Sequence, residues 1–113
     1  MNATANIDRP SGQKKDNLFI LRPWSIEEAI DVKGAAAQAG VSPLTMRDWA
    51  SKKNIGRVVA GRVWISRVAL AAYLDGDAEA LSEYQRGCRS TPRVAAYFRR
   101  LGIPIVEQIK ADG

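Results

Sequence analysis

Apolar side chains recur at helical spacing in two neighbouring segments, which a short turn containing a glycine separates. The first segment, residues 32–39, collects its apolar side chains on one narrow face, formed by Val32, Ala35, Ala36 and Ala39. Asp31 is placed to cap its first turn and Gly40 to end it. Gly34 inside this helix costs about 1 kcal/mol relative to alanine, and the apolar pattern gives no reason for it.

The second helix is predicted to run from Ser42 to about Lys53, with Pro43 in the favoured first turn. Its apolar side is formed by Met46, Trp49 and Ala50. Val41, in the turn, is expected to enter the core between the two helices. The opposite side of the second helix is polar and is expected to face outward.

A hairpin and a third helix follow. Residues 56–65, GRVVAGRVWI, are rich in β-branched side chains and are interrupted at Ala60-Gly61. This pattern is typical of a strand, a tight turn and a second strand. Residues 66–74 then predict a helix with Ser66 as its N-cap.

Two further helices are predicted near the C-terminus, over residues 78–87 and 90–102. The second has Thr91 as its N-cap and Pro92 in its first turn. The remaining residues, 103–113, are expected to form a tail.

The N-terminal residues 1–17 are polar and without clear periodicity, which predicts a disordered arm. The apolar stretch 18–21, LFIL, is expected to be an edge strand or a clamp against the core. After it, Ser25 and Glu28 have the spacing of a capping box that starts a short helical turn.

Composition narrows the possible chemistry. The 113 residues suffice for one modest core, and they include no histidine and one cysteine, Cys88. Most metal-site templates and Cys/His nucleophile arrangements are therefore excluded. Of the net charge of +5, a balance of +5 lies within residues 31–67, whereas residues 68–88 are acidic at −3 and residues 89–113 return to +3. The positive charge is concentrated where the first two helices and the hairpin lie, which suggests an anionic partner.

The order helix, glycine turn, helix, basic hairpin and helix predicts a winged helix-turn-helix. Close crossing of the first two helices needs small side chains at the contact, and the alanines supply them. A plain helical hairpin would use the same small residues equally well. The basic hairpin at 56–65 and the helix that closes the unit favour the winged interpretation.

The segment DVKGAAAQAGVSPLTMRDWASKKNIGRVVAGRVWISRVALAAYL resembles the MerR-like helix-turn-helix superfamily, especially its small excisionase-type DNA-binding domains. The matching pieces are an Ala-Ala helix followed by GVS, then TMRDW, a wing of the form VxxGRxxI and a closing helix of the form xRxxLxxYL. The resemblance covers about residues 31–74. It implies that helix 42–53 enters the major groove and that hairpin 56–65 acts as a wing. Thr45 and Arg47 match its groove-contacting positions, and Arg62 matches its wing-tip arginine.

The sequence therefore predicts a mainly α fold with a small β-hairpin, a winged helix-turn-helix plus C-terminal helices. The expected divisions are a disordered arm at 1–17, a DNA-binding domain at 18–74 and, at 75–113, a helical extension for oligomerisation or partner contact. The candidate DNA-binding residues are polar, basic or exposed residues of the second helix and the hairpin with its flanks: Ser42, Leu44, Thr45, Arg47, Asp48, Ser51, Lys52, Lys53, Arg57, Arg62 and Arg67.

The expected function is sequence-specific binding of double-stranded DNA, as an excisionase-like recombination directionality factor or a small transcriptional regulator of a mobile element. An alternative is a DNA recognition and assembly subunit that resembles a phage small terminase. Self-association on DNA or a homodimer is expected, and residues 78–113 are expected to contact an integrase or another protein. We expect no enzymatic activity, metal or cofactor, no membrane association, and a cytoplasmic location, since no apolar run approaches the roughly 20 residues that span a bilayer.

Overall fold

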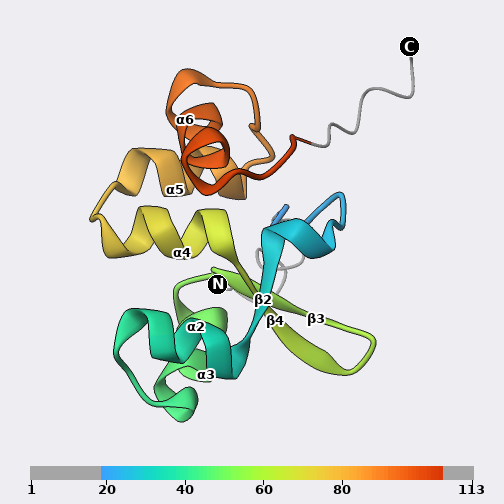
Figure 1. Ribbon diagram of the computed structural model, residues 1–113, viewed down its shortest axis with the longest axis vertical. Helices are drawn as coiled ribbons and strands as arrows, with labels where there is room; N and C mark the ends of the chain where they lie inside the picture. Colours follow the sequence, from blue (N-terminus) through green and yellow to red (C-terminus); the bar gives the residue numbers. More distant parts are fainter. Residues whose placement is uncertain (1–18, 106–113) are drawn as a thin grey trace, which may run out of the picture.

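The computed structural model describes residues 19–105; the predicted arm at 1–17 and the end of the tail, 106–113, lie outside this range. The described chain has a mixed α/β fold with five α-helices, one 3-10 turn and one three-stranded antiparallel sheet (Figure 1). In chain order the elements are η1 (Ile26–Glu28), β2 (Ala29–Asp31), α2 (Val32–Ala39), α3 (Pro43–Lys52), β3 (Gly56–Val59), β4 (Arg62–Ser66), α4 (Arg67–Leu74), α5 (Ala78–Gln85) and α6 (Pro92–Leu101). Between residues 19 and 105, none of the helices has the length and apolar character to cross a membrane.

The three helices around the predicted turn and hairpin begin where their caps were predicted. Each capping side chain accepts a hydrogen bond from the backbone N–H three residues later: Asp31 from Gly34, Ser42 from Thr45, and Ser66 from Ala69. Gly40 follows α2 in the left-handed conformation, with a φ of 74°. The predicted ends of these helices are thus confirmed by local backbone chemistry.

The structure supplies the missing reason for Gly34. A Cβ at this position would lie 2.9 Å from Oδ1 of Asp31 and 3.1 Å from Cγ1 of Ile30. The cap of α2 and the side chain of the preceding strand therefore occupy the space that an alanine would need. The glycine allows α2 to turn tightly out of β2.

The predicted hairpin is present as β3 and β4, but the sheet contains a third strand that the sequence did not indicate. β2 pairs antiparallel with β4 through Ala29 opposite Ser66, Ile30 opposite Ile65 and Asp31 opposite Trp64. The strand order is β2-β4-β3, so β4 is the central strand. Three residues are too few to show an alternating pattern, which is why this strand was missed.

The hairpin turn has both central residues in the left-handed region, with φ of 50° at Ala60 and 80° at Gly61. Two positive φ values identify a turn of the I′ kind, for which Asn-Gly is the preferred pair. Alanine is disfavoured there because its Cβ approaches the following carbonyl oxygen.

Replacing Ala60 with asparagine is therefore expected to raise the free energy of unfolding by about 1 kcal/mol. Ala60 is exposed, so the new side chain meets no packed neighbour. Urea unfolding followed by tryptophan fluorescence measures the change. An unchanged or lower midpoint would show that the turn does not store this strain in solution.

Of the two expectations for the segment before the sheet, the clamp formed by the apolar stretch is borne out and the capping box is not. The part of the 18–21 stretch that the structure describes forms no strand; Ile20 and Leu21 are buried and act as a clamp against the core. The capping box is wrong: a 3-10 turn does start after Ser25, but the serine side chain makes no capping hydrogen bond, and Glu28 is fully buried. Likewise Thr91 precedes α6 without capping it and instead donates a hydrogen bond to Glu83.

Glu28 belongs to a buried polar network that joins the N-terminal segment to the C-terminal helices. Its Oε1 pairs with Nη1 of Arg89 at 2.8 Å, and its Oε2 accepts a hydrogen bond from the hydroxyl of Tyr84. Arg89 also donates two hydrogen bonds to the carbonyl of Arg22, and the Tyr84 hydroxyl accepts the N–H of Leu21 at 3.0 Å. Burial, together with the negative charge of Glu28, raises the pKa of Tyr84 well above its usual value.

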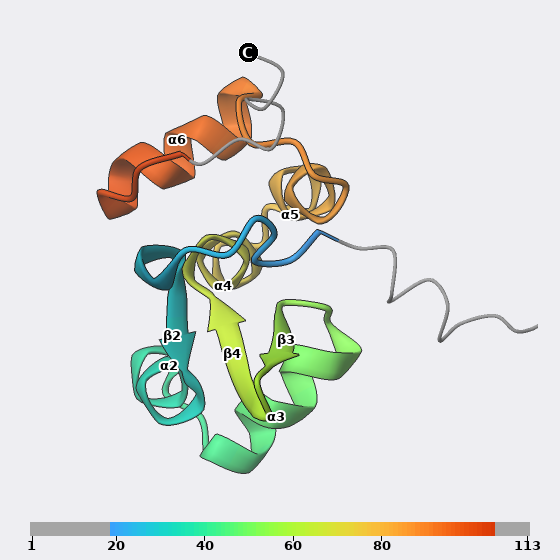
Figure 2. The same ribbon diagram turned by 90° about the vertical axis from the view of Figure 1, so that its right-hand side faces the viewer.

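One hydrophobic core unites the helices on both sides of the sheet. Phe98 of α6 and Tyr84 of α5 belong to the same cluster of buried side chains as Met46 of α3 and Ala36 of α2. Figures 1 and 2 place α5 and α6 at one end of the molecule and α2 and α3 at the other, with α4 and the sheet between them. The structure leaves the predicted boundary between residues 74 and 75 untested.

Candidate nucleic-acid interface

The first turn of α3 is held by two of the candidate residues. The Ser42 hydroxyl accepts the Thr45 N–H at 3.1 Å and donates to the Thr45 hydroxyl at 3.0 Å. Leu44, between them, is 76 % exposed. The start of α3 therefore presents one apolar and two hydroxyl-bearing side chains at the protein surface.

Arg47, one turn further along α3, lines an open hollow of about 310 Å³. The other walls come from the start of α2 and from the tip of the hairpin: Asp31, Val32, Lys33, Gly61, Arg62 and Val63. The fold thus brings the predicted helix arginine and the predicted wing arginine to one concavity. Lys33, which was not among the candidate residues, joins them there.

The C-terminal half of α3 carries exposed charge that is partly neutralised. Lys52 pairs with Asp48 at 3.2 Å, one helical turn apart, as expected for an i, i+4 pair. Lys53 lies with its ammonium 6.0 Å from the ring centre of Tyr73. Ser51 is exposed on the same helix.

The guanidinium of Arg62 is stacked over an aromatic ring. It lies 4.8 Å from the ring centre of Trp64, which is two residues away on the same face of β4. Trp64 is half-buried and meets Trp24 edge-on at 5.7 Å between ring centres. A cation over an aromatic face loses rotational freedom but stays charged, so the wing arginine is held in place while its charge remains available.

Two other basic candidates are engaged within the protein. Arg57, on β3, donates a hydrogen bond to the carbonyl of Leu21 at 3.2 Å, and Arg67 donates to the carbonyl of Glu27 at 2.9 Å. Burial, together with the charge of Arg22, lowers the pKa of Arg57 from its usual value. Both arginines tie the N-terminal segment to the sheet and to α4, away from the hollow that contains Arg47.

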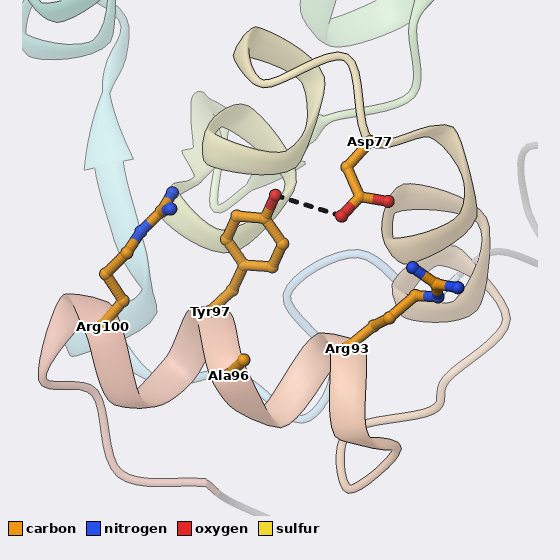
Figure 3. Close-up of a pocket in the computed structure, with 5 residues that line it drawn as sticks. All are labelled: Asp77, Arg93, Ala96, Tyr97 and Arg100. Atoms are coloured by element: carbon orange, nitrogen blue, oxygen red, sulfur yellow. Dashed lines mark hydrogen bonds between the residues drawn. The ribbon is translucent and has the colours of Figure 1, made fainter.

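A second hollow, of about 330 Å³, lies on α6 and is lined by Asp77, Arg93, Ala96, Tyr97 and Arg100 (Figure 3). Its charges are compensated, because Arg93 pairs with Glu79 at 2.6 Å and Arg100 with Asp75 at 3.1 Å. The Tyr97 hydroxyl donates to Asp75 at 2.8 Å and lies 3.3 Å from Asp77.

These contacts explain two shifted pKa values around the second hollow. Burial and the hydrogen bond to Asp75 raise the pKa of Tyr97 to about 12. The same hydrogen bond, followed by that from Arg100, lowers the pKa of Asp75. The two arginines of this hollow are thus paired with carboxylates, whereas Arg47 and Arg62 beside the first hollow have no ion pair within residues 19–105.

Residues 19–105 contain no group of three or more His, Cys, Asp or Glu side chains placed to hold a metal ion. The hollow beside Arg47 is lined by three cationic side chains, those of Lys33, Arg47 and Arg62. Its chemistry is that of exposed guanidinium and ammonium groups. No protein-family model, curated protein or solved structure matches the chain.

Proposed function

We propose that the chain is a sequence-specific double-stranded DNA-binding protein of the winged helix-turn-helix kind, with α3 in the major groove and the β3–β4 hairpin as the wing. The observation that carries this proposal is the convergence of Arg47 and Arg62 at one open hollow. A helix and a hairpin that both contact one duplex must present cations on a common surface. The hairpin projects beyond the helices in Figure 1, as a wing would.

Exposed side chains at the start of α3 support a role in reading bases. Arg47 donates in the fork geometry that suits guanine O6 and N7, and Thr45 lies two residues earlier on the helix. Leu44 is suited to apolar contact with a thymine methyl group. Because the N-terminal residues of a recognition helix contact base edges in helix-turn-helix proteins, these side chains are the ones we assign to sequence recognition.

Within this class, we favour an excisionase-like recombination directionality factor or a small transcriptional regulator over the terminase-like alternative. The apolar residues of α6, namely Val94, Tyr97 and Phe98, pack into the chain's own core and leave a basic outer face. A helix that assembled a ring of subunits would instead keep apolar side chains for its neighbours. Contacts with an integrase or a second copy through residues 78–113 remain part of the proposal.

Arg47→Ala is expected to weaken binding to a preferred duplex by about 1–3 kcal/mol and to relax the base preference at one position. The preferred duplex is obtained by selecting bound sequences from a random library with the unmodified protein. Titration of the selected duplex and of variants at each base pair then measures the affinity and specificity.

Arg99→Ala is the matched control, since it removes the same charge from the exposed face of α6, away from α3. This control is expected to retain both the affinity and the base preference. Selection that enriches no sequence would overturn sequence-specific binding. Equal behaviour of the Arg47 and Arg99 variants would overturn the assignment of α3 to the groove.

A further inference from the structure

Most basic side chains of the described chain have a partner, and the exceptions are informative. Lys52, Arg93 and Arg100 pair with carboxylates, whereas Arg57, Arg67 and Arg89 donate to backbone carbonyls. Six basic side chains have neither an ion pair nor a hydrogen bond to another residue within 19–105: those of Arg22, Lys53 and Arg99, and those of Lys33, Arg47 and Arg62. The last three differ from the others in where the fold places them. These three line the same hollow.

The three cations come from separate elements that the fold brings together. Lys33 lies in the first turn of α2, Arg47 in the middle of α3 and Arg62 at the start of β4. One carboxylate, that of Asp31, also lines the hollow, and its Oδ1 accepts the Gly34 N–H at 2.8 Å. The lining therefore has a balance of +2, and its single carboxylate is already engaged in capping α2.

Three like charges gathered at one surface repel one another unless an anion joins them. The long, flexible side chains of Lys33 and Arg47 can relieve this repulsion by pointing into solvent, but Arg62 is stacked on Trp64. A phosphate in the hollow would receive charge-assisted hydrogen bonds from Lys33 and Arg62, and its charge would offset the repulsion that Arg47 adds.

We propose that this hollow seats a single backbone phosphate of DNA, held by Lys33 and Arg62, while Arg47 at the edge of the same hollow keeps the base-reading role proposed above. The inference rests on the proposed function, which concerns binding to a duplex, and deepens it by naming the atoms that are bound. Val32 and Val63 supply apolar lining next to the cations, which a deoxyribose ring adjoining the phosphate can contact. A free carboxylate ligand would bring no sugar ring to cover this apolar wall.

The phosphate seat, meaning the proposed phosphate site in this hollow, is tested with inorganic phosphate in the absence of DNA. Backbone amide resonances of the full chain are followed during phosphate titration, for the unmodified protein, Lys33→Gln and the control Arg99→Gln. We expect saturable shifts at Gly61 and its neighbours, weakened about fivefold by Lys33→Gln and unchanged by Arg99→Gln. Shifts that are scattered over the surface, or equal in the two variants, would overturn the seat.

The contact with DNA is tested by the salt dependence of binding to a mixed-sequence duplex. Loss of one phosphate contact reduces the slope of log K against log salt by about 0.9, and we expect this reduction for Lys33→Gln but not for Arg99→Gln. If the unmodified protein binds the duplex and Lys33→Gln keeps its slope, the phosphate seat is wrong and the proposed function stands. If the unmodified protein binds inorganic phosphate in the hollow but binds no duplex, the proposed function is wrong. The assignment of this phosphate site to a DNA backbone is then wrong as well.

Discussion

Replacing Arg89 with methionine is expected to lower the free energy of unfolding by about 3–5 kcal/mol, the usual cost of breaking a buried ion pair from one side. Arg89 is 5 % exposed and Glu28 is fully buried, so the remaining carboxylate would have no access to water. Methionine fills much of the volume of the arginine stem but leaves the carbonyl of Arg22 without its two donors. Equilibrium unfolding in urea measures the loss.

Arg86→Met is the matched control, because Arg86 is exposed and its side chain, among residues 19–105, bonds only the nearby Ser82 hydroxyl at 2.7 Å. A surface substitution of this kind is expected to cost no more than about 0.5 kcal/mol. Adding Glu28→Gln to Arg89→Met should recover part of the loss, since an amide costs less to bury than a carboxylate and still accepts from Tyr84. A loss no greater than that of the control would show that the Glu28–Arg89 pair does not stabilise the contact between the segment before the sheet and the C-terminal helices.

Replacing Phe98 with alanine is expected to cost about 3–5 kcal/mol, the range for removing a fully buried phenylalanine. Its ring contacts Tyr84 at 6.4 Å and the guanidinium of Arg89 at 5.5 Å between centres, so the cavity would open beside the buried ion pair. All three tryptophans precede residue 65 in the chain. Because α6 shares one core with α3, we expect Trp49 fluorescence and helical circular dichroism to report the same lowered unfolding midpoint.

The other phenylalanine, Phe19, provides the control for this substitution. Phe19 is 36 % exposed, so Phe19→Ala removes less buried surface and should cost clearly less than Phe98→Ala. Fluorescence that kept its original midpoint while circular dichroism lost helix early would contradict a single cooperative core. It would mean instead that the C-terminal helices unfold separately from α3.

The elements that the sequence predicted correctly are those fixed by local chemistry. A capping side chain, a proline in the first turn or a glycine with positive φ acts within four residues, so Asp31, Ser42 and Gly40 marked their helix ends directly. β2 and the Glu28–Arg89 pair depend on partners at least 33 positions away. The local sequence around Glu28, SIEE, is polar and charged, and it did not indicate that the carboxylate of Glu28 would be buried.

The residues of the candidate interface show the same difference between local and long-range determinants. Arg47 and Arg62 were chosen as exposed cations on a helix face and at a turn, and the structure finds both exposed beside one hollow. Arg57 and Arg67 looked equivalent in sequence, but their carbonyl partners belong to a segment about 36–40 positions earlier in the chain. Lys33 was overlooked because its closeness to the hairpin follows from the pairing of β2 with β4.

The junction between β4 and α4 has no connecting residue: the strand ends at Ser66, and the helix begins at Arg67. Ser66 is fully buried, caps α4 through Ala69 and donates its own N–H to Ile55. β4, which is the central strand of the sheet and one strand of the proposed wing, thus continues directly into a helix of the core, with no flexible linker at its base. If the protein binds DNA as proposed, a wing that does not fit the straight duplex requires the DNA to bend, because the wing itself cannot move. The protein would then prefer sequences whose bending costs little free energy.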